Sequence, residues 1–195
     1  MTKGRLEAFT DGVVAIIITI MVLELKTPAG FDLKALTSLW PTFAMYAMSF
    51  VYVGIYWNNH HHMMHAVHRI NGAVLWANMH LLFWLSLVPF TTRWMGESWI
   101  ENPVVKPALP FAVYGVSLIM PAIAYTLLVR ALIAANGKDS LLARAIGADW
   151  KGYVSLVFYA VGIGLSFWNV LAALACYATV AAIWFLPDRR IEKKA

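Results

Sequence analysis

The sequence predicts an all-α, polytopic membrane protein with six transmembrane helices, and two observations favour this class. Of the 195 residues, 61% are hydrophobic and only 13% are charged, whereas soluble domains carry roughly 25% charged residues. The apolar residues also fall into long segments with short polar stretches between them. A water-soluble domain of 195 residues does not need so many apolar residues to form its core, so the chain is expected to lie within a bilayer.

We expect a single domain, residues 1–195, that contains all six segments. Their approximate spans are 6–25, 39–59, 71–91, 108–133, 153–167 and 170–186. Only residues 166–169 separate the last two segments, which predicts a tight helical hairpin. The connectors around 95–107 and 136–149 are expected to be small and polar.

The positive charges test this count, because cytoplasmic loops of membrane proteins are enriched in Lys and Arg. With the N-terminus in the cytoplasm, 11 of the 15 basic residues fall on that side. They are Lys3, Arg5, Arg69, Arg130, Lys138, Arg144, Lys151, Arg189, Arg190, Lys193 and Lys194. The formal net charge of +5 therefore sets orientation rather than binding nucleic acid, and both termini are expected to be cytoplasmic.

The first segment is too short to face lipid on all sides. Its fully apolar part, from Val13 to Leu23, has 11 residues, and a lipid-facing helix needs about 20. Asp11, Glu24 or both must therefore enter the membrane zone, where a carboxylate is costly unless it faces protein or water. We expect an inner helix that the rest of the chain shields from lipid.

Helical periodicity places four residues of this segment on one face: Ile16, Thr19, Ile20 and Leu23. Asp11 and Ala15 are expected to begin nearly the same stripe. Such a stripe either packs as ordinary core or lines a narrow symmetric pore whose apolar rings gate by dewetting. Spacing alone favours packing, and a pore would require several copies of the chain around an axis.

A polar set is expected where the first helix begins and the second ends, because both points lie on the cytoplasmic side. It comprises Arg5, Thr10, Asp11, His60 and His61. A buried Asp11 needs a cation or several hydrogen-bond donors. The set is either a satisfied structural network or a gating element that senses pH through histidine.

The histidine run offers a third pattern, because His61, His65 and His68 are expected on one helical face with a spacing that could ligate metal. Membrane desaturases and hydroxylases need several histidine boxes, and only His80 lies outside this cluster. We therefore assign no metal ligand, no cofactor and no enzymatic activity. A lone metal site or a solvated interfacial patch remains a more favoured interpretation of the cluster than di-iron chemistry. Glu24 is expected either to attract cations or to pair with Lys26, and Glu97 and Glu101 are expected to be solvated.

Three motifs resemble those of a known family. Arg5-x-x-x-Phe9-Thr10-Asp11 is similar to the Arg-x-x-x-Phe-Ser-Asp signature of the transmembrane protein 175 potassium channels. The second-helix ending Trp57-x-x-His60-His61 and the third-helix ending Val88-Pro89-Phe90 also resemble that family. One departure is Thr10 in place of Ser, which keeps the hydroxyl but adds a β-branch that restricts its rotamers.

The resemblance implies a homotetramer whose first helices surround a central cation pore. It implies a hydrophobic constriction at Ile16, further apolar rings at Ile20 and Leu23, and a contribution of Thr19 to selectivity. It also implies a polar network that holds the pore helices and comprises Arg5, Phe9, Thr10, Asp11 and His60 or His61.

The expected function is a potassium-permeable leak channel of a prokaryotic inner membrane, with modest selectivity for K⁺ over Na⁺. Its expected partners are other copies of itself, the lipid bilayer and monovalent cations. Three alternatives remain open: a proton-conducting or proton-coupled transporter that uses Asp11 and the histidines, a histidine-ligated metalloenzyme, and a purely structural membrane protein.

Overall fold

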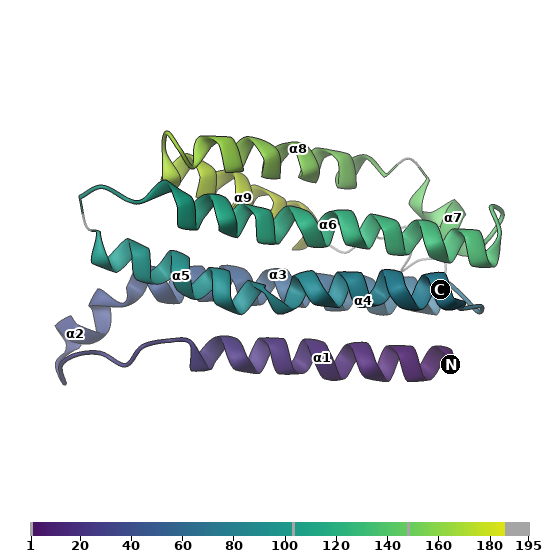
Figure 1. The fold of residues 1–195 in the computed structure, drawn as a ribbon, viewed down its shortest axis with the longest axis horizontal. Coiled ribbons are helices and arrows are strands. Elements are labelled where there is room, and N and C mark those ends of the chain that lie inside the picture. Colours follow the sequence, from purple (N-terminus) through teal and green to yellow (C-terminus); the bar gives the residue numbers. More distant parts are fainter. Residues whose placement is uncertain (1, 103, 148, 186–195) are drawn as a thin grey trace.

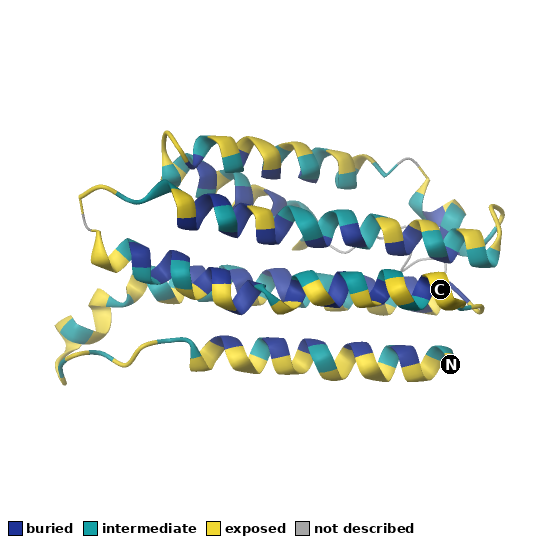
Figure 2. Cartoon of the chain, viewed as in Figure 1, coloured by how far each residue is buried: buried dark blue, intermediate teal, exposed yellow. Residues whose placement is uncertain are grey.

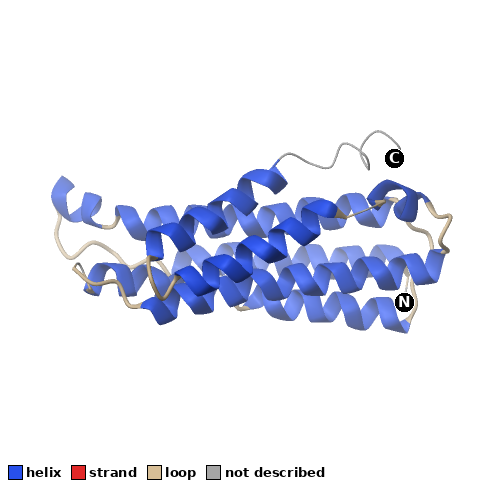
Figure 3. Cartoon of the chain, turned by 90° about the horizontal axis from the view of Figure 1, so that it is seen from above, coloured by secondary structure: helices blue, strands red, loops and turns tan. Residues whose placement is uncertain are grey.

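A computed structural model describes residues 2–102, 104–147 and 149–185, and within these ranges the regular structure is helical throughout (Figure 3). The all-α class is therefore confirmed. The helices of the described residues are α1 (Lys3–Leu23), α2 (Leu33–Ser38), α3 (Trp40–His65), α4 (Gly72–Ser86), α5 (Val88–Glu101), α6 (Ala108–Asn136), α7 (Leu141–Ile146), α8 (Trp150–Leu165) and α9 (Val170–Phe185).

The long helices lie side by side along one axis and alternate in direction (Figure 1). α1 runs from one end of the bundle to the other, α3 returns, and α4 with α5, α6, α8 and α9 continue the alternation, so α9 runs back toward the end where α1 begins. By length and composition, α1, residues 72–101 and α6 could each cross a membrane, and α8 and α9 are shorter apolar helices. The basic tail residues Arg189, Arg190, Lys193 and Lys194 lie outside the described residues.

The third segment does not stop near Thr91, as the sequence suggested. α4 ends at Ser86, and α5 begins directly after Leu87 with Pro89 in its first turn. Proline lacks a backbone N–H, which an α-helix does not need at that point, so the helix restarts instead of ending. The connector expected at 95–107 is therefore wrong in part, because residues up to Glu101 are helical.

Two short helices were also not expected from the sequence. α7 lies inside the connector predicted at 136–149; Ser140 caps it by accepting a hydrogen bond from the Ala143 N–H, and Gly147 follows it with a positive φ of 52°. α2 is capped by Asp32, which accepts from the Ala35 N–H at 2.8 Å. Both helices have only 6 residues, too few for the apolar periodicity that reveals longer helices.

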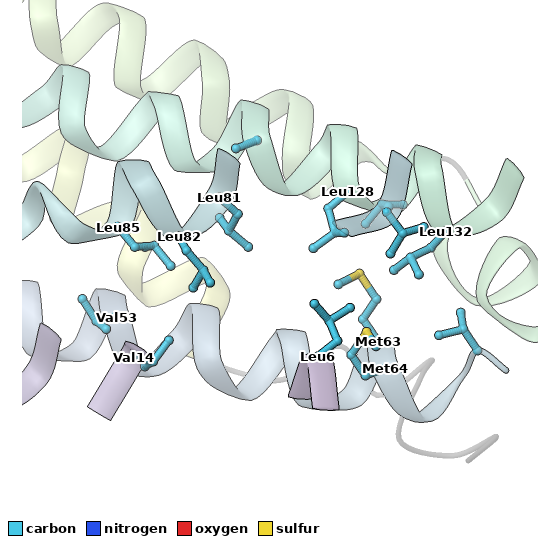
Figure 4. Close-up of a cluster of buried hydrophobic side chains, with 14 of the residues drawn as sticks. Leu6, Val14, Val53, Met63, Met64, Leu81, Leu82, Leu85, Leu128 and Leu132 are labelled. Atoms are coloured by element: carbon cyan, nitrogen blue, oxygen red, sulfur yellow. The ribbon is translucent and has the colours of Figure 1, made fainter. Parts of the chain in front are cut away.

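One hydrophobic cluster joins α1, α3, α4 and α6 (Figure 4). Leu6 of α1 lies beside Met63 and Met64 of α3, and Val14 of α1 lies near Val53 of α3 (Figure 4). The exposed fraction of each of these side chains is 3% or less. The same cluster continues through Met63, Met64, Leu81, Leu85, Leu128 and Leu132. It packs one side of α1 against the bundle.

In a second hydrophobic cluster, the hairpin of α8 and α9 packs against α3 and α6. The Tyr177 hydroxyl donates to the Phe111 carbonyl at 3.2 Å, and the Tyr52 hydroxyl donates to the Tyr177 carbonyl. The hairpin turns at residues 166–169, as the sequence predicts, with the Asn169 N–H bonded to the Leu165 carbonyl at 2.7 Å.

Gly115 of α6 is a sensitive point in this packing. A Cβ atom there would meet the Tyr177 hydroxyl and would lie 2.6 Å from Cγ1 of Ile163. We expect Gly115→Ala to lower the free energy of unfolding by about 1–3 kcal/mol through overpacking, measured as a lower thermal midpoint in detergent.

Gly164 of α8 is the matched control, because a Cβ there has nothing within 4 Å. Gly164→Ala should change stability by no more than about 1 kcal/mol. Equal thermal midpoints for the two variants would contradict the close approach of α6 to Tyr177.

Candidate functional site

The first helix lies at the edge of the bundle and is covered along one side only (Figure 2). Its buried residues are Leu6, Thr10, Val14, Ile17 and Met21. They recur at intervals of three and four residues, so they share one face of the helix. The expectation that the rest of the chain shields this helix is therefore wrong for a single chain, because its opposite face is exposed.

The predicted stripe lies on the exposed face of α1. The exposed fraction is 58% for Ile16, 41% for Ile20 and 80% for Leu23, and Thr19 between them is exposed as well. Spacing alone favoured packing of this stripe inside one chain. That interpretation does not account for the exposure of these residues. A continuous apolar face of this kind marks a contact with lipid or with another protein surface.

Thr19 places a hydroxyl oxygen on this exposed face. Its hydroxyl lies 3.0 Å from the carbonyl oxygens of both Ala15 and Ile16, one turn back along α1. The single hydroxyl proton is directed at the main chain, so the oxygen lone pairs remain available as acceptors. An oxygen in that state can contact a cation.

Asp11 does not begin the same stripe, and that expectation is wrong. Its Oδ1 accepts a hydrogen bond from Nε1 of Trp57 at 2.9 Å, which directs it toward α3, whereas Ile16 and Ile20 border α5. Five residues of α-helix correspond to about 500° of rotation, which leaves Asp11 and Ile16 roughly 140° apart. The two residues therefore occupy opposite borders of the exposed face.

A groove of about 820 Å³ runs between α1 and α5 beside Ile16 and Ile20. Its walls are mainly apolar, with Val13, Ile17, Pro89, Phe90 and Trp94 among the lining residues, and its rim carries Glu24, Arg93 and Glu97. The groove continues the exposed face of α1 onto α5.

An ion-pair chain joins the end of α1 to α5 at this rim. Arg93 donates to Glu24 at 2.6 Å and to Glu97 at 2.9 Å, and Lys26 lies 3.0 Å from Glu97. Glu24 therefore pairs with Arg93 and not with Lys26, and Glu97 is not a freely solvated charge as expected. Glu101 is exposed at the last residue of α5. Arg93 and Glu97 are four residues apart on α5, whereas the Arg93–Glu24 and Lys26–Glu97 pairs join segments far apart in sequence, which local charge spacing could not reveal.

A second polar link is fully buried and joins α1, α3 and α4. Asn78 donates through Nδ2 to the Thr10 hydroxyl at 2.9 Å, and its Oδ1 lies 2.9 Å from Nε2 of His60. The exposed fractions are 1% for Thr10, 0% for Asn78 and 2% for His60. With Oδ1 as the acceptor, Nε2 of His60 must carry a proton, so every member of the link is satisfied.

The predicted polar set thus divides into two parts. Thr10 and His60 belong to the buried link, whereas Asp11 binds Trp57, whose ring stacks on His61 with centroids 6.3 Å apart. Arg5 and Phe9 lie exposed on α1 and join neither part of the described structure.

Asn78 was missed by the sequence reasoning, although one signal pointed to it. It is an amide in the middle of the apolar segment predicted at 71–91, and a polar side chain inside a membrane segment usually has a partner. The sequence could not show which residue that partner is.

The three-histidine face is also not formed. α3 ends at His65, and His68 lies beyond it, where the backbone N–H groups of His68 and Arg69 bind Oδ1 of Asn136 at 3.0 and 2.9 Å. His61 and His65 remain neighbours, and Nε2 of His80 accepts a hydrogen bond from Trp84. In the ranges that the structure describes, no group of three or more His, Cys, Asp or Glu residues could hold a metal ion.

Comparisons with known proteins agree with this fold. The sequence model of a family described as endosomal/lysosomal potassium channel TMEM175 matches residues 5–89. A protein of Chryseobacterium sp. (strain P1-3), named a potassium channel, is 54% identical over 194 residues, which is 99% of this chain and 97% of that protein. Human TMEM175, named an endosomal/lysosomal proton channel, is 35% identical over 86 residues, which is 38% of this chain and 17% of the human protein.

A solved structure shows the same arrangement of helices. It is a crystal structure described as a lysosomal potassium-selective channel TMEM175 homolog from Chamaesiphon minutus, with a TM-score of 0.81 and 29% sequence identity. The match covers 95% of this chain and 97% of that chain. Fold and sequence together define a helical protein of the membrane-channel class. The chain belongs to the TMEM175 family.

Proposed function

We propose that this chain is a potassium-permeable leak channel in which four copies of α1 surround a central pore. The observation that carries this proposal is the exposed face of α1, where Ile16, Thr19, Ile20 and Leu23 are uncovered while the opposite face of the helix packs against the bundle. Three relatives that match more than 90% of this chain are named potassium channels. A single copy leaves this face without a partner, and a ring of copies would enclose it.

In this assembly Ile16 forms the narrowest ring, and Ile20 and Leu23 form further apolar rings one and two turns along. An ion passes only when the constriction is wetted or when the ion sheds part of its hydration shell. The Thr19 hydroxyls supply oxygens beside this barrier. A single ring of hydroxyls replaces little of the hydration shell, so the preference for K⁺ over Na⁺ is modest.

The buried link from Thr10 through Asn78 to His60 holds α1 in register against α3 and α4 in this proposal. Asp11, Trp57 and His61 secure the same helix at its other border, and Arg5 and Phe9 face neighbouring copies. The network is a scaffold that keeps the pore helix from rotating, and it involves no catalytic step and no cofactor.

We further infer that the chain forms a single six-span domain in a prokaryotic inner membrane with both termini cytoplasmic. Lys3, Arg69, Lys138, Arg144 and Lys151 lie in or beside the segments at the end of the bundle where α1 begins (Figure 1). The positive-inside rule assigns that end to the cytoplasm.

Ion flux from proteoliposomes tests the proposal. With K⁺ inside and Na⁺ outside, the reconstituted protein should generate a K⁺ diffusion potential that empty vesicles lack.

Proton conduction is the second candidate, because His60 is buried beside Thr10 and Asn78 and human TMEM175 is named a proton channel. Flux that rises steeply with acidity and is lost in folded Asp11→Asn would favour protons and contradict the potassium proposal.

A further inference from the structure

Two exposed histidines at the end of α3 have imidazole nitrogens to which the proposed pore gives no role. His61 and His65 are four residues apart on the same helix, and both are exposed. Their ring centroids are 4.4 Å apart with the ring planes at 74°. The conduction proposal gives His65 no role, and His61 enters it only through its stack on Trp57.

This spacing suits metal chelation. Histidines at positions i and i+4 project from one face of a helix, which is the arrangement that holds zinc in helical two-histidine motifs. Zinc binds imidazole nitrogens at about 2.0–2.1 Å in tetrahedral geometry, so two ligating nitrogens lie roughly 3.3 Å apart. The ring centroids of His61 and His65 are 4.4 Å apart, which places the two imidazoles close enough to share one ion after their rings reorient.

The position on the helix also favours a cation. His65 is the last residue of α3, and His61 is one turn earlier. The C-terminal end of a helix carries partial negative charge from its unpaired carbonyl groups, which stabilises a nearby positive charge. Geometry and electrostatics therefore favour the same kind of ligand.

We propose that His61 and His65 chelate one borderline divalent transition-metal ion, of the class of Zn²⁺ or Ni²⁺. Among the residues that the structure describes, no third His, Cys, Asp or Glu completes the ligand set, so water occupies the other coordination positions. An open site of this kind exchanges its ion, as a regulatory site does, and does not hold the fold together.

The proposed site is coupled to the first helix by direct contacts. The His61 ring stacks on Trp57, and Nε1 of Trp57 donates to Asp11 of α1. A bound ion restrains the orientation of His61 and so restrains the contact between α3 and α1. The site is separate from His60, which is buried in the link with Asn78.

Zn²⁺ titration of the tag-free, full-length protein in detergent tests the proposal by calorimetry after removal of bound metal with a chelator. We expect one Zn²⁺ per chain, and His65→Gln should weaken binding roughly tenfold or more because a ligand is lost. His65→Cys should retain binding, because a thiolate also ligates zinc. Mg²⁺ should not compete, since it prefers oxygen ligands.

His62→Gln is the matched control. His62 also contacts the His61 ring, with centroids 5.7 Å apart, but its position next to His61 in the sequence is the wrong spacing for a shared helical face. Equal affinity for Zn²⁺ in wild type and in folded His65→Gln, equal losses in the His62 and His65 variants, or no binding by the wild type would overturn the proposal. The assay does not depend on ion flux, so its failure is distinct from a failure of the proposed channel function.

Discussion

Replacing Ile16 with Ala should raise the K⁺ flux of the reconstituted protein roughly tenfold, which corresponds to lowering the permeation barrier by about 1.4 kcal/mol. Ile16 is 58% exposed on the uncovered face of α1, so in a ring of four copies its side chain narrows the pore. A smaller side chain widens the ring and weakens dewetting. Flux from vesicles loaded with K⁺, normalised to the amount of folded protein, measures the effect.

Ile17→Ala is the control for this prediction, because Ile17 is rotated by about 100° from Ile16 and is buried against the bundle. Ile17 is only 4% exposed and packs in the cluster with α3 and α4. Its truncation should reduce stability by about 2–5 kcal/mol without raising flux per folded channel. Ile16→Asn should alter rate or selectivity as well, because it makes the constriction polar. Unchanged flux in both Ile16 variants would contradict the assignment of the constriction.

Replacing Asn78 with Leu should lower the free energy of unfolding by about 2–5 kcal/mol, because it leaves two buried polar groups without a partner. The Thr10 hydroxyl loses its donor, and Nε2 of His60 loses its acceptor. Leu has the same number of side-chain heavy atoms and the same branch point, so it leaves no cavity and the cost reports mainly the lost hydrogen bonds. Thermal unfolding followed by gel filtration in detergent measures the change.

A double-mutant cycle separates the link from general damage to packing. Thr10→Val removes the hydroxyl that Asn78 contacts, so Asn78→Leu should cost less in that background than in the wild type, by about 1 kcal/mol or more. Additive effects of the two substitutions would mean that the bond between Asn78 and Thr10 contributes nothing measurable to holding α1 in place.

Helical periodicity explains why part of the candidate site could be predicted. Residues three and four apart share a helical face whatever surrounds the helix, so the set of Ile16, Thr19, Ile20 and Leu23 follows from α1 alone. The placement of Asp11 on the same stripe was wrong, since the rotation of about 100° per residue separates it from Ile16. The three-histidine face was wrong because it assumed that α3 continued past His65.

The partners of the polar residues could not be predicted by the same reasoning. Asn78 and Thr10 are 68 residues apart, and Arg93 and Glu24 are 69 apart. Each of these contacts depends on the distance and rotation between separate helices, which local spacing does not contain. The same is true of Thr91 and Ser117, whose hydroxyls lie 2.8 Å apart between α5 and α6.

Composition and periodicity are enough to predict the membrane class, the helical content, the hairpin at 166–169 and the shared face of Ile16, Thr19, Ile20 and Leu23. These features follow from the hydrophobicity of each segment and from the regular geometry of a helix, and neither depends on contacts between distant parts of the chain. Which face of α1 is buried depends on how the other helices pack against it. α3, α4 and α5 cover Thr10, Val14 and Ile17 and leave Ile16 and Leu23 exposed. That packing places Val14 and Ile17 in the hydrophobic cluster and satisfies the Thr10 hydroxyl through Asn78.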